Sequence, residues 1–134
     1  MAASLPELLT DFSSVGNASK EEIDRVQEGL GRGLPSEYLE FLLYTDGGEG
    51  FIGKSYVMFW SAHELLEFNR DYKVDEYAPG LFLIGSSGGG EAYALDLRTE
   101  PPTFVSVPFV GMGLDHVRKV GGTFLDFLVG LASK

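Results

Sequence analysis

The sequence predicts one α+β domain, an antiparallel sheet with helices packed around it. The patterns run in the order helix, helix, strand, helix, several consecutive strands and a last helix, which lacks the regular strand–helix alternation of a parallel α/β sheet. A length of 134 residues with 44% hydrophobic side chains is sufficient for one core. No repeat or linker divides the chain, so we expect a single domain over residues 1–134, with its core at about 19–132.

Three helices are expected before the first strand, counting a short one over residues 4–12 with Ser4 as its N-cap. After a loop at 13–17, Ser19 and Glu22 form a capping box that opens a second helix, which ends at Gly31.

The third helix, at about 35–44, organises the chain. Pro35 suits its first turn, and Asp46-Gly47-Gly48 is a stop signal, because glycine accepts the left-handed conformation. Its apolar stripe recurs at helical spacing and should face the core; it consists of Leu34, Tyr38, Phe41, Leu42 and Leu43.

The middle of the chain predicts a turn at 49–53 and then a strand at 54–60, so continuously apolar that we expect it to be central. Trp60, the only tryptophan, ends this run, and core packing is favoured there over a partner contact. Ser61 and Glu64 form a second capping box for a helix over 62–72. This helix should bury Ala62, Leu65, Leu66 and Tyr72, and a loop with Pro79 should follow at 73–80.

The last third predicts a hairpin of strands at 81–85 and 91–97, joined by a flexible turn at 86–90, with Tyr93, Leu95 and Leu97 facing inward. A third strand follows at 103–107, and Pro108 either ends it or places it at an edge. The glycine-interrupted stretch 109–120 has no clear pattern. Thr123 should cap a last helix that covers the sheet with Phe124, Phe127, Leu128 and Leu131.

Two stretches resemble the signatures of the SUKH superfamily. The first is Leu34-Pro35, Tyr38 and Phe41-Leu42 at helical spacing, ending in Asp46-Gly47-Gly48; the second is residues 83–96, an apolar strand, a glycine-rich turn and a strand ending in Asp96. With residues 60–65 between them, the resemblance covers about residues 20–130. It implies a single α+β domain. In bacteria it most often implies an intracellular immunity protein that neutralises a toxin, commonly a nuclease, whereas fungal members act as interaction hubs.

Composition restricts the class of protein and of partner. The chain has no cysteine, which excludes disulfides, and we find neither a secretory signal nor eighteen consecutive apolar residues. We therefore expect a soluble cytoplasmic protein that does not bind membranes. The formal charge of −10 disfavours nucleic acid as a ligand and would attract a basic protein, such as a toxin domain. Solubility alone is the other explanation of this charge.

Motifs for catalysis are weak. Gly85-Ser86-Ser87-Gly88-Gly89 fits the nucleophile-elbow pattern of serine hydrolases, with Ser87 as the nucleophile, but an elbow needs a helix after it and a strand pattern follows here. The same stretch lacks the lysine of a phosphate-binding loop. His63 and His116 have no metal-ligand spacing beside them. We therefore expect no enzyme activity, no cofactor and no metal.

Three acidic segments next to aromatic side chains or bare backbone are the candidate partner-binding loops, since this combination suits a basic protein surface. Their candidate contact residues are Asp46, Glu49 and Phe51, then Asp71, Asp75, Glu76 and Tyr77, and finally Glu91. The sequence therefore predicts a non-enzymatic, protein-binding domain, and the SUKH resemblance implies an immunity protein against a basic toxin. The alternatives are a scaffolding or signalling module of the same fold and, more remotely, a small serine hydrolase using Ser87.

Overall fold

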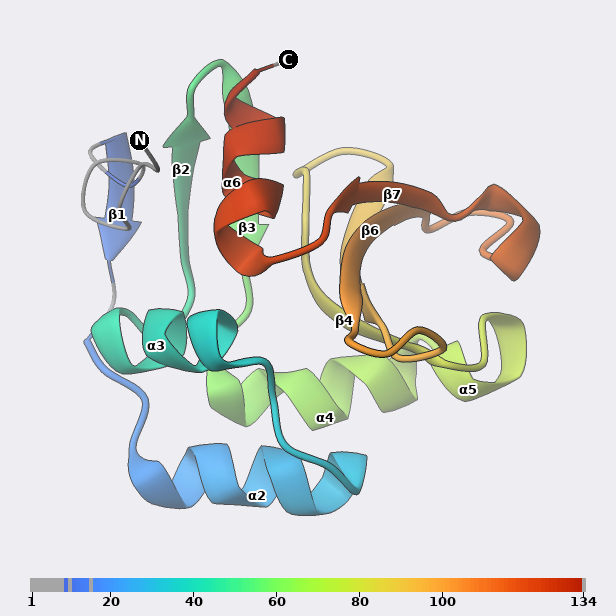
Figure 1. Ribbon diagram of the computed structural model, residues 1–134, viewed down its shortest axis with the longest axis horizontal. Helices are drawn as coiled ribbons and strands as arrows, with labels where there is room; N and C mark the ends of the chain where they lie inside the picture. The colour runs from blue at the N-terminus through green and yellow to red at the C-terminus, as the bar shows by residue number, and fades with distance from the viewer. Residues whose placement is uncertain (1–8, 10, 15, 134) are drawn as a thin grey trace.

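The computed structural model describes residues 9, 11–14 and 16–133 (Figure 1). Seven strands form one sheet in which each strand pairs antiparallel with the next along the chain. The expected α+β class with an antiparallel sheet is confirmed. The strands are β1 (Asp11–Ser14), β2 (Gly48–Ile52), β3 (Ser55–Phe59), β4 (Leu81–Ser86), β5 (Glu91–Asp96), β6 (Thr103–Pro108) and β7 (Arg118–Gly121).

The longer helices gather on one side and at one end of this sheet. Figure 1 shows α6 lying in front of β3, while α2 and α4 run side by side below. The elements are α2 (Lys20–Leu30), α3 (Ser36–Tyr44), α4 (Ala62–Asp71), the one-turn α5 (Val74–Tyr77), the 3-10 turn η1 (Leu114–His116) and α6 (Phe124–Ala132). The caps predicted at Ser19 and Thr123 are present, since each hydroxyl accepts a bond from a backbone N–H three residues later.

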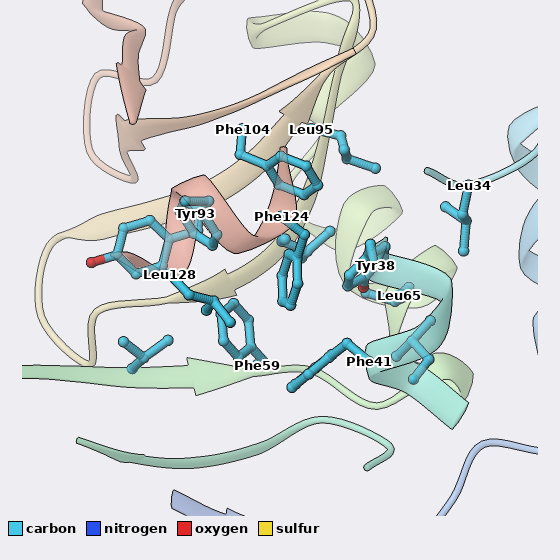
Figure 2. Close-up of a cluster of buried hydrophobic side chains, with 14 of the residues drawn as sticks. Leu34, Tyr38, Phe41, Phe59, Leu65, Tyr93, Leu95, Phe104, Phe124 and Leu128 are labelled. Carbon is cyan, nitrogen blue, oxygen red and sulfur yellow. The ribbon is translucent and has the colours of Figure 1, made fainter. Parts of the chain in front are cut away.

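The inner face of the sheet, the face covered by α3 and α6, carries an aromatic core. Phe124 is at its centre (Figure 2). Its ring centroid lies 5.0–5.9 Å from those of Tyr38, Phe41, Phe59, Phe104 and Phe127. The helical spacing predicted for α6 therefore faces the core as expected.

The outer face, opposite the inner face, is covered over only part of its width. On β4 to β6 its side chains are small or aliphatic, and Val74 and Ala78 pack against them with residues of the segment 109–117. The buried residues of this second cluster on the strands are Leu81, Leu83, Ala92, Ala94, Val105 and Val107. Strand β5 is therefore buried on both faces, not only at the expected inward positions.

The two parts of the sheet meet at a narrow seam. Strands β3 and β4 pair at Met58 with Ser86 and at Phe59 with Gly85, and the N–H of Trp60 adds one further bond to the carbonyl of Ile84. Beyond that point Asn69 of α4 takes the place of a strand partner: its amide donates to the carbonyl of Leu83 (2.9 Å) and accepts from the Leu83 N–H (2.7 Å). The side chain thus satisfies backbone groups that the diverging strand leaves unpaired.

Three expectations for the first two strands are wrong. The predicted helix over 4–12 lies largely outside the described residues, but Asp11 and Phe12 belong to β1, as does the start of the expected loop at 13–17. The expected turn at 49–53 is mostly strand β2. Its glycines misled the prediction: a Cβ on Gly48 would lie 2.3 Å from a carbonyl oxygen of β1, and one on Gly50 would lie 2.4 Å from another. These glycines therefore allow close strand pairing.

Further corrections concern helix ends and surface exposure. Helix α3 begins after Pro35, which is its N-cap, and it ends at Thr45 in an extended conformation rather than at a left-handed glycine. Leu43 and Tyr72 are 48% and 44% exposed and do not enter the core. The expected loop at 73–80 contains α5, and the unassigned stretch 109–120 contains η1 and most of β7. Pro108 is the last residue of β6, which pairs on both sides.

Candidate functional site

The uncovered part of the outer face is a small surface on the β2–β3 hairpin, which we call the hairpin surface: Glu49, Phe51, Tyr56 and Met58. The strand register sets Glu49 opposite Met58 and Phe51 opposite Tyr56. The rings of Phe51 and Tyr56 meet edge to face at 5.3 Å. The Tyr56 hydroxyl donates to Glu49, and this hydrogen bond raises the pKa of Tyr56. The hairpin surface therefore combines a carboxylate with two aromatic rings, and Phe51 is 49% exposed.

Next to this surface lies a line of rings from three segments, which we call the aromatic row: Trp60, Phe68, Tyr72 and Phe109. The Trp60 ring meets that of Phe68 edge to face at 4.9 Å and lies parallel to that of Tyr72, with centroids 6.1 Å apart. The Tyr72 ring lies 4.9 Å from that of Phe109. Trp60 is half-buried, so it both packs on the core and contributes to the surface.

The hairpin surface and the aromatic row are continuous along β3. Trp60 follows Met58 by two positions, and its N–H continues the ladder by donating to the carbonyl of Ile84. In an extended chain such positions share one face. The turn between β4 and β5 borders both surfaces, because Gly88 lies against Tyr56 and the N–H of Phe109 donates to the carbonyl of Gly90.

The predicted contact residues distribute unevenly over the molecule. Glu49 and Phe51 belong to the hairpin surface, and Asp71 is exposed beside Tyr72. Asp75 and Glu76 are also exposed, but they line an open hollow of ≈ 690 Å³ between α2, α4 and β4, together with Arg70 and Lys73.

The remaining three predicted residues lie apart. Tyr77 is 53% exposed on α5. Glu91 lies opposite Pro108 and lines a separate hollow of ≈ 360 Å³ with Asp115, His116 and Arg118. Asp46 has a structural contact, since one of its carboxylate oxygens accepts from the N–H of Ala62 (2.6 Å) and so caps α4.

Ser87 lies in a hairpin turn rather than at a nucleophile elbow. Strand β5, not a helix, follows it. Its hydroxyl accepts from the N–H groups of Gly89 and Glu91 at 3.2 and 3.4 Å, and within the described part of the chain no hydrogen bond joins it to a histidine. The geometry that the hydrolase alternative requires is therefore not formed.

One group of side chains could hold a metal ion. Glu22, Asp46 and His63 each offer a donor atom, and these atoms lie within 4.8 Å of one another. The two carboxylates already accept backbone N–H groups, from Ser19 and Ala62, and His63 Nδ1 lies 3.0 Å from the hydroxyl of Ser61. We interpret the group as a structural link between α2, the end of α3 and α4, because each of its side chains contacts a residue at the start of α2 or α4.

The sequence interpretation missed Tyr56 and Met58 of the hairpin surface and Phe68 and Phe109 of the aromatic row. Tyr56, Met58 and Trp60 are spaced by two, which is the strand signal of a shared face. This spacing is present in the sequence, but the residues between them are apolar as well, so no alternation of apolar and polar side chains is apparent. Phe68 and Phe109 could not be found in this way, because they come from other segments.

A family model described as SMI1 / KNR4 family (SUKH-1) matches residues 17–130. This span begins just before α2 and ends within α6, so it contains the hairpin surface and the aromatic row. The chain belongs to this family. SUKH domains are commonly immunity proteins. No curated protein matches the chain, and no described helix is both long and apolar enough to cross a membrane.

Proposed function

We propose that this SUKH-1 chain is an immunity protein that acts in the cytoplasm by binding and neutralising a basic toxin domain, with nucleases as the toxin class that suits its charge. The observation that supports this most is the open outer face. Its aromatic rings stand beside carboxylates, whereas on β4 to β6 the outer face is covered. Large aromatic side chains with a polar atom are the typical anchors of protein interfaces.

Charge supports the same partner. The net charge of −10 would speed the approach of a basic protein and would repel a nucleic acid. A nuclease toxin is basic where it binds its anionic substrate, so acidic side chains such as Glu49 and Asp71 would compete for that surface. Binding would then occlude the toxin, and no chemical step in this chain is needed.

The test is co-expression. The reading frames beside the gene are expressed singly in a bacterial host, and any toxic product is then expressed with this protein. We expect growth to be restored by the wild type and lost in a triple variant carrying Glu49→Lys, Asp75→Lys and Glu76→Lys. A matched control, with Glu28→Lys, Glu40→Lys and Glu67→Lys on other exposed helix positions, changes the net charge equally.

The control separates a specific surface from general charge. If both triple variants fail to protect, the net charge alone accounts for binding. If both protect, the acidic residues of the candidate loops are not the interface. If no neighbouring product is toxic or none is neutralised, the immunity proposal is wrong and the scaffolding alternative takes its place.

A further inference from the structure

We infer that the aromatic row, together with the adjoining hairpin surface, is a docking site for arginine side chains, so that the partner binds through an arginine-bearing segment. This rests on the proposed function only for the identity of the partner. The chemistry of the surface can be tested without the partner.

The first argument is the set of partly exposed rings. Tyr72 is 44% exposed although its ring contacts those of Trp60 and Phe109, and the other three rings of the row are half-buried. A guanidinium group is planar and weakly hydrated, and it stacks on aromatic faces within about 6 Å of the ring centroid. A lysine ammonium is a compact, strongly hydrated charge that gains less from such a surface. Contiguous, partly exposed rings therefore favour arginine.

The second argument is the charge around these rings. The outward positions of β1 to β3 that pair across the register are Asp11, Ser13, Glu49, Phe51, Tyr56 and Met58, which include two carboxylates and, within these described strands, no lysine or arginine. At the other end Tyr72 lies between the exposed residues Asp71 and Lys73, whose charges offset each other. A cation on the rings would thus find its acidic partners at the end formed by β1 and β2, at Asp11 and Glu49.

The same charges argue against other occupants. A second copy of this chain would bring its own carboxylates and a further charge of −10 to the contact. Phosphate groups of nucleic acids or of lipids would be repelled for the same reason. A cationic protein segment is the occupant that the charge favours.

The experiment uses the only tryptophan as the reporter. Trp60 lies within the row, so its fluorescence reports directly on a group bound there. The folded protein is titrated with a peptide of nine arginines and, separately, with a peptide of nine lysines at physiological ionic strength. We expect the arginine peptide to change the emission and to bind about fivefold to tenfold more tightly than the lysine peptide.

Two tyrosine variants provide a matched comparison. Tyr72→Leu removes a ring of the row, whereas Tyr44→Leu removes one of similar exposure, 48%, on α3. Melting temperatures of both are measured first to establish that both are folded. The preference for arginine should disappear in Tyr72→Leu and remain in Tyr44→Leu.

Other outcomes overturn the inference. Equal affinity for the two peptides, or an equal effect of the two variants, would show that binding follows total charge and not the rings. These results are independent of the co-expression test. Loss of protection with an intact arginine preference would refute the immunity role alone, whereas protection without that preference would refute only this docking chemistry.

Discussion

The two parts of the outer face differ in what covers them, although both belong to one sheet. On β4 to β6 the outward side chains are small or aliphatic, and α5 and the segment 109–117 lie on top of them. On β1 to β3 the outward positions carry larger or charged groups such as Glu49 and Tyr56; Glu49 and Phe51 are exposed, and Tyr56 and Met58 are half-buried beside the turn at Gly88. Small side chains allow a second layer to approach closely, whereas large polar-tipped ones keep such a layer away.

The sharpest test of this difference places one charge in each part. Ala94→Lys puts an ammonium group in the covered cluster, where Ala94 is fully buried. It should lower the free energy of unfolding by at least about 4 kcal/mol, because an unpaired charge is removed from water. Met58→Lys, opposite Glu49 on the hairpin surface, should change it by less than about 0.5 kcal/mol. Urea unfolding measures both, and similar losses would show that the hairpin surface is not open.

The second test compares the inner face with the open part. Phe124→Ala removes the central ring of the aromatic core and should cost about 3–5 kcal/mol of unfolding free energy. Phe51→Ala removes a ring that is 49% exposed and should cost less than about 1 kcal/mol. The comparison uses the denaturant midpoints of the two variants, provided that the unfolding free energy depends equally steeply on denaturant concentration in both. A large loss in Phe51→Ala would mean that this residue supports the fold rather than a partner.

The third test concerns the seam between the two parts. Asn69→Ala leaves the backbone N–H and carbonyl of Leu83 without their side-chain partner. We expect a loss of about 1–3 kcal/mol and faster hydrogen exchange at the Leu83 amide. The control Asn17→Ala removes an exposed amide that donates to a carbonyl of α3, at Leu43, and should cost less. Unchanged exchange at Leu83 would contradict the bridging role of Asn69.

The smallest effect is a pH dependence at the end of the covered part. The guanidinium of Arg98 donates two hydrogen bonds to the buried Asp96, at 3.0 and 2.9 Å, and lowers the pKa of that carboxyl below its ordinary 3.8. The unfolded chain therefore binds a proton more readily. The stability that the pair provides is present above the ordinary pKa and is lost as the pH falls through the lowered folded pKa.

Asp96→Asn should accordingly reduce the loss of stability that the protein undergoes as the pH falls. Between about pH 5 and pH 2 the variant should lose up to about 1 kcal/mol less than the wild type, a limit set by the solvent exposure of Arg98. Thermal melts across this range measure it, with Asp115→Asn at an exposed carboxylate as the control. An equal loss of stability at acid pH in the wild type and in Asp96→Asn would show that the Asp96–Arg98 pair does not contribute to the pH dependence.

Helices were predicted better than strands because their signals are local. The Ser19 and Thr123 caps and the spacing of Phe124, Phe127 and Leu128 each lie within a few residues, and the structure confirms them. Strand β2 was missed because the role of its glycines depends on β1, a strand about 37 residues earlier in the chain. The carbonyl groups of β1 approach Gly48 and Gly50 closely. A glycine that serves close pairing cannot be distinguished locally from one that serves a turn.

The sequence by itself determined the α+β class, the family resemblance that the family match confirms, most helix boundaries and the acidic charge. Only the tertiary structure decided which predicted residues share a surface. It placed Glu49 and Phe51 opposite Met58 and Tyr56 on the face of β3 that leads to Trp60, it made Asp46 a helix cap, and it set Glu91 apart. The reason is that periodicity assigns a side chain to a face, whereas the layer that covers that face comes from segments far away in the chain.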